Sequence, residues 1–326
     1  MSRGKIAVIG AGTTGGSWAG LFAAHGFEVA VFDVREGAAA AALERAAAAA
    51  RFLAAKGLAD PVLTEEGLAL LAAPATLAQA VAGAALVQEC VHEDLELKRS
   101  VFAQVSRLAP ADALIATSSS GLSITSIQQD ALSPGRTLAA HPYNPPHLVP
   151  LVELAPGALT LPAALERARE LYRRVGKEPV VMKVDIPGYI ANRLSAALWR
   201  EAIELVLRGV ATVEDVDRAV RFGPGLRWAV MGPHLIYHLG GGKSGIRGHL
   251  LHLAASKEGM LRDLAAWTTF PPEAADLLEA GVQAGVGEKT LEELEQERDE
   301  AVAALLATLR QTASLQENRP AKENAL

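Results

Sequence analysis

Three glycines near the start of the chain, Gly10, Gly12 and Gly15, lie between an apolar run and a helix-forming stretch. At a strand-to-helix turn, the first glycine allows the tight turn and the second lets a pyrophosphate approach the backbone. The third lets the helix pack closely on the strand. The free N–H groups at the helix start favour phosphate. We therefore expect a dinucleotide site that also includes Thr13 and Thr14.

Asp33 ends a second apolar run, residues 29–32, and follows the glycine motif at the distance typical of a dinucleotide fold. A carboxylate at this place accepts hydrogen bonds from the adenosine ribose hydroxyls, and its charge repels a 2′-phosphate. The expected cofactor is therefore NAD rather than NADP. Arg35 stands two residues later and could weaken that preference.

His141 stands at the end of one strand-like run and Glu153 follows at the next, and together they have the chemistry of a general base. Oxidation of an alcohol by hydride transfer requires a group that takes the hydroxyl proton as the carbonyl forms. A carboxylate beside an imidazole fixes its tautomer and stabilises the imidazolium, leaving the other ring nitrogen for the substrate. The sequence therefore predicts a histidine base with an acidic partner.

Apolar strand-like runs alternate with helix-like segments in the first part of the chain, in the manner of a doubly wound parallel sheet. Near residue 187 the pattern changes to helical periodicity. We expect an α/β fold: a Rossmann-type NAD-binding domain at 1–187, an all-helical substrate and dimerisation domain at 188–315, and a disordered tail at 316–326. The strands expected after the first two are residues 86–89, 114–117, 137–140, 151–154 and 179–183, and the main helices are 38–56, 95–108, 161–175, 190–207, 213–220 and 291–309.

The composition agrees with an enzyme of the cytoplasm. The 326 residues carry a net charge of −6, which does not indicate a nucleic-acid surface. One cysteine excludes an internal disulfide, and no apolar stretch is long enough to cross a bilayer. The N-terminus lacks the apolar segment of a signal peptide.

These motifs, in this order along the chain, resemble the L-3-hydroxyacyl-CoA dehydrogenase family. The resemblance extends to about residue 238 and implies an NAD-dependent dehydrogenase that acts on a 3-hydroxyl group and is a homodimer through its helical domain. The segments that carry it, besides the glycine motif, are Gln88-Glu89-Cys-Val-His-Glu93-Asp-Leu-Glu-Leu-Lys98, Ser118-Ser-Ser120-Gly-Leu, His141-Pro-Tyr-Asn144-Pro, Leu151-Val-Glu153 and Pro187-Gly-Tyr-Ile-Ala-Asn192-Arg.

The resemblance also implies roles for single residues. His141 corresponds to the catalytic base and Glu153 to its partner acid, while Ser120 and Asn192 correspond to the groups that bind and orient the substrate oxygen. Both can donate to an oxygen that becomes more negative during ketone reduction. The residues that correspond to the nicotinamide side of the cofactor pocket are Glu89, Glu93 and Lys98.

Within the family, the segment 223–233 is similar to a branch that acts on free acids and includes gulonate 3-dehydrogenase, lambda-crystallin and carnitine dehydrogenase. Arg227 can hold a free carboxylate through two parallel hydrogen bonds, a group that a thioester lacks. Arg227 and the adjacent Trp228 are therefore expected to bind substrate. A gulonate-like 3-hydroxy acid is the first expectation, carnitine the second and a short-chain 3-hydroxyacyl-CoA the third, with a non-enzymatic crystallin-like role as a remote alternative.

Two further groups of residues have the types that could bind a ligand or a metal. Trp199, Trp228 and Tyr237 could contribute to an aromatic cage for the trimethylammonium group of carnitine, although aromatic residues at such positions more often belong to a core. His249 and His252 have the spacing of one helix face, but no carboxylate or cysteine completes a metal-ligand pattern. No metal is expected.

Overall fold

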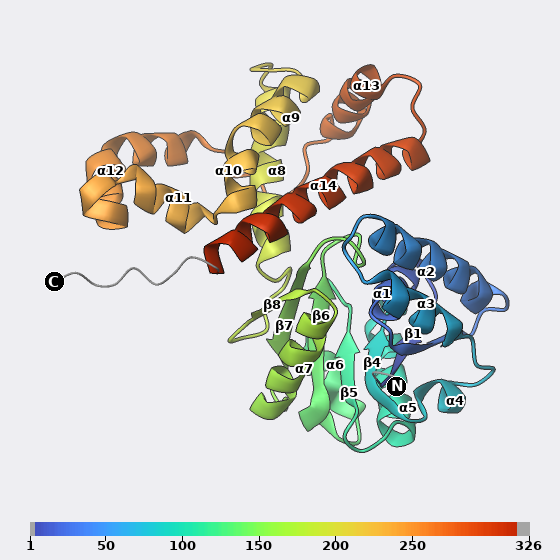
Figure 1. Ribbon diagram of the computed structural model, residues 1–326. Coiled ribbons are helices and arrows are strands. Elements are labelled where there is room, and N and C mark those ends of the chain that lie inside the picture. Colours follow the sequence, from blue (N-terminus) through green and yellow to red (C-terminus); the bar gives the residue numbers. More distant parts are fainter. Residues whose placement is uncertain (1–3, 318–326) are drawn as a thin grey trace. The chain divides into compact units, whose positions relative to one another are not determined.

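The computed structural model describes residues 4–317 and divides into two compact units (Figure 1). The first comprises the chain up to Ala191 together with the segment from Arg298 onward, and the second comprises Asn192–Glu297. The last helix, α14 (Leu291–Glu317), contributes to both units. It continues two residues into the segment expected to be a disordered tail, and residues 318–326 of that segment lie outside the described residues.

The first unit is built on one eight-stranded sheet, with the strand order β3-β2-β1-β4-β5-β6-β7-β8. All neighbouring strands are parallel except β6 and β7, so the predicted doubly wound sheet is confirmed and contains one antiparallel pair. The strands are β1 (Lys5–Ile9), β2 (Glu28–Phe32), β3 (Leu71–Ala72), β4 (Ala84–Glu89), β5 (Leu114–Thr117), β6 (Thr137–Pro142), β7 (Leu151–Pro156) and β8 (Glu178–Val181).

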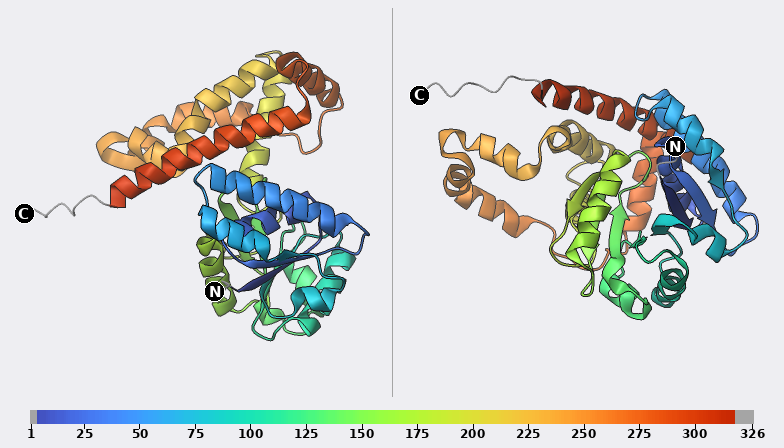
Figure 2. Two further views of the ribbon diagram at one scale, coloured as in Figure 1. Left: turned by 45° about the vertical axis from the view of Figure 1, so that its right-hand side comes forward. Right: turned by 60° about the horizontal axis from the view of Figure 1, so that its bottom comes forward.

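Helices cover both faces of this sheet (Figure 2). Alternate residues of β1 point to opposite faces, so Ile6 and Val8 belong to one buried cluster while Ala7 and Ile9 belong to the other. One face packs against α1 (Thr13–Ala24), α2 (Ala38–Ala55), α7 (Pro162–Arg174) and the later part of α14, and α3 (Pro61–Ala69) lies against α1 and α2. The other face packs against α4 (Leu77–Val81), α5 (Leu95–Leu108) and α6 (Ile124–Ile127).

The chain leaves β1 toward β2 on one side and takes up β4 on the other, so the strand order reverses between β1 and β4. In open α/β sheets, ligands bind outside the carboxyl ends of the strands at such a reversal. Gly10, which follows β1, and Cys90, which follows β4, both lie at this place. The topology therefore puts the glycine motif where a cofactor site is expected.

The second unit is helical. It contains most of α8 (Ala191–Leu207), the helices α9 (Val213–Phe222), α10 (Pro224–Val230), α11 (Pro233–Gly240), α12 (Gly245–Asp263) and α13 (Ala274–Val286), and the first turns of α14. Two carboxylates on α8 hold the segment that follows α12: Glu201 accepts the backbone N–H of Ala265 at 2.8 Å, and Glu204 accepts the indole N–H of Trp267 at 3.1 Å. Within residues 4–317, no helix combines the length and apolar character needed to span a bilayer.

Candidate active site

The glycine turn between β1 and α1 has the geometry that the motif predicts. Gly10 has φ 103°, and a Cβ there would lie 2.5 Å from the backbone carbonyl of Cys90. A Cβ on Gly15 would lie 1.9 Å from the carbonyl oxygen of Gly10, so only glycine lets α1 approach the turn so closely. Around Gly12 nothing lies within 4 Å of the position of a Cβ. This leaves open space at the N-terminus of α1, next to Thr13 and Thr14.

The carboxylate of Asp33 lies directly after β2, beside this turn. Its Oδ2 accepts the backbone N–H of Ala11 at 2.7 Å, and its Oδ1 accepts the backbone N–H of Arg35 at 2.9 Å. The guanidinium of Arg35 donates to both oxygens at 3.0 Å. These bonds from Arg35, with that from Ala11, lower the pKa of Asp33 to about 2, so the group is ionised as a ribose acceptor must be.

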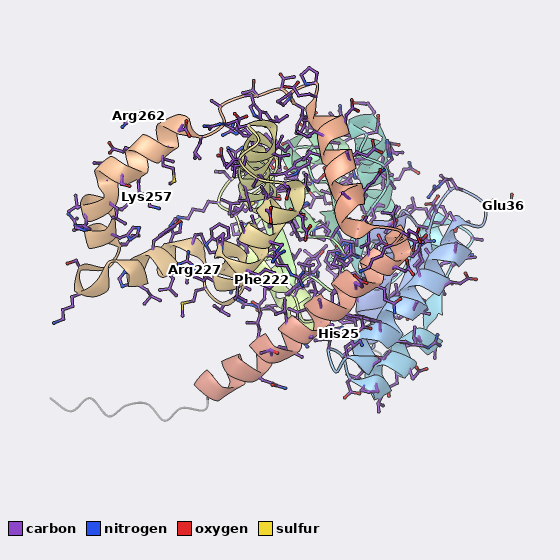
Figure 3. The ribbon with its side chains drawn as sticks, turned by 90° about the horizontal axis from the view of Figure 1, so that it is seen from above. His25, Glu36, Phe222, Arg227, Lys257 and Arg262 are labelled. Carbon is purple, nitrogen blue, oxygen red and sulfur yellow. The ribbon has the colours of Figure 1, made fainter. Side chains whose placement is uncertain are left out.

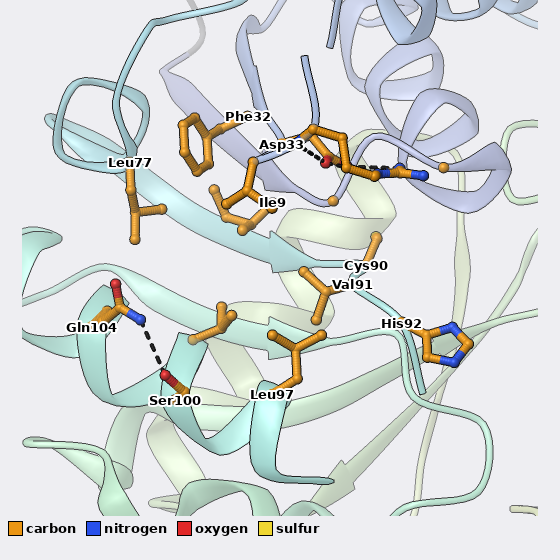
Figure 4. A pocket seen from close by; sticks show the side chains of 15 residues that line it. Ile9, Phe32, Asp33, Leu77, Cys90, Val91, His92, Leu97, Ser100 and Gln104 are labelled. Carbon is orange, nitrogen blue, oxygen red and sulfur yellow. Dashed lines mark hydrogen bonds and ion pairs between the residues drawn. The ribbon is translucent and has the colours of Figure 1, made fainter. Parts of the chain in front are cut away.

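A pocket of about 680 Å³ extends from this carboxylate across the end of the sheet (Figure 4). Gly10, Gly12 and Asp33 line its polar side. Its other walls are largely apolar and come from the ends of β1 and β2 and from α4 and α5, including Ile9, Phe32, Leu77, Leu97 and Val101. A cleft with an apolar floor, an anion-binding helix N-terminus and one carboxylate fits adenosine and a pyrophosphate.

His141 and Glu153 face each other across the antiparallel pair β6 and β7, where they are register partners. The imidazole Nδ1 lies 2.9 Å from Glu153 Oε2, and both side chains are buried, with 5% and 1% of their surface exposed. Glu153 Oε1 accepts the backbone N–H groups of Ile190 and Ala191 at 2.8 and 3.0 Å. Burial opposes ionisation of Glu153, but these hydrogen bonds outweigh it and lower its pKa. The carboxylate is therefore charged and orients the imidazole so that Nε2 remains for a substrate.

Ser120 follows β5 on an exposed turn, and the carboxylate of Glu93 holds that turn. Glu93 Oε1 accepts the backbone N–H groups of Ser120 and Gly121 at 3.1 and 2.9 Å and the hydroxyl of Ser119 at 2.6 Å. Burial of Glu93 acts against these bonds, yet they keep its pKa below the ordinary value. The Ser119 side chain is a site component that the sequence analysis did not single out. Its place in the serine run beside Ser120 was the available signal.

Glu89 and Lys98 form a buried ion pair next to Glu93. Lys98 Nζ lies 2.8 Å from Glu89 Oε1 and 3.4 Å from Glu93 Oε2. The side chains of Lys98 and Glu89 are almost fully buried. Burial raises the pKa of Glu89, although Lys98 acts in the opposite direction. The three residues expected on the nicotinamide side of the pocket thus bind one another and the serine turn. Direct contact between them and a cofactor stays a prediction.

The chain matches the NAD-binding domain of 3-hydroxyacyl-CoA dehydrogenase over residues 5–186 and the C-terminal domain of the same enzymes over residues 188–294. The chain belongs to the 3-hydroxyacyl-CoA dehydrogenase family. Its cofactor is NAD, and its reaction is that of an NAD-dependent dehydrogenase acting on a CH–OH group. The family expected from the motifs is therefore confirmed.

Among family members, the chain is 40% identical to the L-carnitine dehydrogenase of Streptomyces griseus, over 93% of this chain and 89% of that protein. It is 38% identical to the L-carnitine dehydrogenase of Pseudomonas putida, over 94% of both chains. A similar solved structure is that of 5-formyl-3-hydroxy-2-methylpyridine 4-carboxylic acid 5-dehydrogenase, an NAD⁺-dependent dismutase. That structure has a TM-score of 0.79 and 31% identity, and the match covers 95% of this chain and 99% of the other.

Three residues predicted to bind substrate belong to the second unit. Asn192 is half-buried in the first turn of α8, directly after the two residues whose amides bind Glu153. Arg227, on α10, is exposed, and none of the ion pairs among the described residues involves it (Figure 3). Its neighbour Trp228 is half-buried. Arg227 therefore presents an unneutralised guanidinium that is available to a carboxylate.

Two of the three aromatic residues considered for a trimethylammonium cage make separate ring contacts. The ring of Trp199 packs against that of Phe270, with centroids 5.6 Å apart. Tyr237 packs against His249, and Lys257 Nζ lies 5.4 Å from the centroid of the Tyr237 ring. No ring contact between any two of the three cage candidates occurs within the described part of the chain. Nor do His, Cys, Asp and Glu side chains in that part form a group of three or more suited to a metal ion.

Proposed function

We propose that this protein oxidises the 3-hydroxyl group of L-carnitine with NAD. The observation that carries the proposal is the name shared by its relatives: proteins called L-carnitine dehydrogenase are 36–40% identical to the chain over more than nine-tenths of its length. The sequence motifs put a gulonate-like acid first and carnitine second. The relatives favour the second of these substrates.

The carboxylate and the hydroxyl group of L-carnitine each have proposed partners. Its carboxylate pairs with the free guanidinium of Arg227, and its hydroxyl oxygen accepts hydrogen bonds from Ser120 and Asn192. His141 Nε2 takes the hydroxyl proton, because Nδ1 is engaged by Glu153 at 2.9 Å. NAD, when bound, would supply the acceptor for the hydride of the carbinol carbon. The resulting imidazolium lies against the ionised Glu153 carboxylate, which stabilises the new charge.

The cofactor is proposed to lie in the pocket beside the glycine turn. The open backbone at Gly12 and the N-terminus of α1 would hold the pyrophosphate, and Asp33 would accept hydrogen bonds from the ribose hydroxyls. The apolar walls at Leu77 and Leu97 receive the adenine ring. Glu93 acts indirectly by holding the Ser120 turn in place.

The substrate is tested by NADH formation with L-carnitine, L-gulonate, L-3-hydroxybutyrate and L-3-hydroxybutyryl-CoA. The highest kcat/KM is expected for L-carnitine, and His141→Ala is expected to reduce kcat by about 100-fold or more. Arg227→Ala is expected to raise KM for carnitine steeply and leave NAD binding unchanged. Arg218→Ala is the matched control. Arg218 is also exposed in the second unit, but its guanidinium is paired, with Nη1 3.7 Å from Glu214 Oε1.

Two outcomes would contradict the proposal. One is a CoA ester that is the best substrate and whose turnover does not change in Arg227→Ala. The other is a His141→Ala variant with nearly normal turnover. L-gulonate as the best substrate would contradict the choice of carnitine alone; it would retain the free-acid chemistry and restore the first of the three sequence expectations.

The homodimer is part of the same proposal and rests on apolar side chains of the second unit. Large apolar groups exposed on several helices of one unit are typical of a protein interface, and a second copy of the chain would cover them. Sedimentation of the purified protein tests the dimer. The proposed location is the cytoplasm, because cytoplasmic proteins rarely contain disulfides and this chain forms none internally. The exposed apolar side chains include Phe222, Leu226, Val230, Leu235, Leu239, Leu250, Leu251 and Leu261.

A further inference from the structure

Tyr189 is the one residue other than glycine with a positive φ within the described chain, at 49°. It follows Gly188, which has φ 76°, and it precedes α8. A bulky residue in the left-handed region is strained, and such strain persists only where the surroundings impose it. Glycine would adopt this conformation without strain, so the side chain of Tyr189 requires an explanation.

The ring of Tyr189 lies flat against the imidazole of His141. The two centroids are 4.8 Å apart and the planes are inclined by 23°. Only 1% of the Tyr189 surface is exposed, so the ring covers one face of the imidazole and excludes water from it. The stacking therefore limits rotation of the imidazole about its side-chain bonds.

The residues after Tyr189 hold the other member of the pair. The backbone N–H groups of Ile190 and Ala191 donate to Glu153 Oε1, while Glu153 Oε2 contacts His141. The left-handed turn at Tyr189 thus lets one short segment contact both groups, His141 through the ring and Glu153 through the next two amides. This gives a physical reason for the strained backbone.

The hydroxyl of Tyr189 is buried and has no hydrogen-bond partner among the described residues. The side chain lies in the apolar cluster that also contains Ile124 and Ile127. A buried, unpaired hydroxyl destabilises a fold, so its presence does not explain why an aromatic residue stands here. The ring itself is the functional part of the side chain.

We propose that Tyr189 is a positioning residue for His141: its ring fixes the plane of the imidazole with Nε2 toward the substrate, and its π face stabilises the imidazolium formed when the hydroxyl proton is taken. The face of an aromatic ring attracts a cation, and this attraction strengthens when water is excluded. The inference rests on the proposed role of His141 as base. The carboxylate in contact with the stacked pair is Glu153, and the carboxylates of Glu93 and Asp185 also act on Tyr189 electrostatically.

The test compares Tyr189→Phe, which keeps the ring, with Tyr189→Leu, which removes it. Tyr189→Phe is expected to retain the kcat and the pH profile of the wild type. Tyr189→Leu is expected to lower kcat about 10-fold, to leave KM for NAD unchanged, and to move the acidic limb of the kcat/KM profile to lower pH, because the imidazolium loses its aromatic neighbour.

Thermal unfolding supplies a matched control. Tyr189→Phe removes an unpaired hydroxyl and is expected to raise Tm. Tyr172→Phe removes a hydroxyl that donates to Gln88 in the same unit and is expected to lower Tm. A Tyr189→Phe variant that loses activity as strongly as Tyr189→Leu would overturn the inference, since the hydroxyl rather than the ring would then be the active part.

An NMR titration measures the stacking directly and does not depend on the Leu variant folding. The His141 ring protons, assigned by comparison with His141→Ala, are expected to show an upfield ring-current shift in the wild type and in Tyr189→Phe. Absence of that shift, or a Tyr189→Leu enzyme with normal kcat and pH profile, would overturn the inference alone. An active His141→Ala enzyme would instead overturn the proposed function.

Discussion

The amino group of Lys177 is buried without a carboxylate partner among residues 4–317, and this makes the stability of the first unit depend on pH. The side chain is 3% exposed, and Nζ donates to the carbonyl oxygens of Pro146 and Val149 at 2.5 and 2.6 Å. It also lies 4.8 Å from the centroid of the Trp18 ring. Burial lowers the pKa of Lys177 from 10.5 to about 7.

A proton therefore binds Lys177 more weakly in the folded chain than in the unfolded chain. Below pH 7 Lys177 is protonated in both the folded and the unfolded chain. Its lowered pKa then destabilises the folded state by about 5 kcal/mol relative to a lysine of ordinary pKa, at about 1.4 kcal/mol for each unit of pKa. Between pH 7 and 10.5 the unfolded chain binds more protons, so stability rises with pH. The gain from this one group between pH 7 and pH 9 is about 2 kcal/mol.

Urea unfolding at pH 7, 8 and 9 measures this gain when the wild type is compared with Lys177→Met. The difference in unfolding free energy between the two proteins is expected to change by about 2 kcal/mol across that range in favour of the wild type at high pH. Subtracting the variant removes the contributions of other titrating groups. Parallel pH profiles for the two proteins would refute a depressed pKa at Lys177.

Three further outcomes follow from the site. Asp33→Ala is expected to narrow the preference for NAD over NADP, because it removes the ribose acceptor and frees Arg35 for a 2′-phosphate. If the double variant Asp33→Ala/Arg35→Ala uses NADP as well as Asp33→Ala does, Arg35 does not bind the 2′-phosphate. Glu153→Gln is expected to lower kcat, and combining it with His141→Ala should have far less than a multiplicative effect; multiplicative losses would mean independent roles. Gly15→Ala is expected to abolish NAD binding, measured by fluorescence quenching, because its Cβ would meet a carbonyl oxygen at 1.9 Å.

Much of the first unit was predictable because its strands are buried apolar runs bounded by polar turns. The predicted strand 114–117 and the predicted helix 95–108 coincide with β5 and α5. The reversal of direction between β6 and β7 was not predicted, since an apolar run has the same pattern in either direction. The short elements β3 and α4 have too few residues for a periodicity to be recognised.

The site was predictable where function depends on residue type and spacing, as in the glycine motif and the pairing of His141 with Glu153. It was not predictable where function depends on contacts between distant segments. The stacking of Tyr189 on His141 joins residues 48 positions apart in the sequence, and no local pattern indicates it. The sequence likewise suggested that Arg35 could weaken the preference for NAD, but it did not indicate the two guanidinium bonds that link Arg35 to Asp33.

Because helix α14 is shared between the two units, it affects the order in which they can fold during synthesis. From Arg298 onward this helix belongs to the first unit, where Ala303 is 1% exposed and lies in the same buried cluster as α1 and α2. Arg310 donates to the carbonyl oxygen of Leu58 at 3.0 Å. A ribosome completes the strands of the sheet more than a hundred residues before it reaches these positions. The sheet of the first unit therefore cannot complete its apolar core during synthesis, and part of its apolar surface stays uncovered until the whole helical unit has been synthesised.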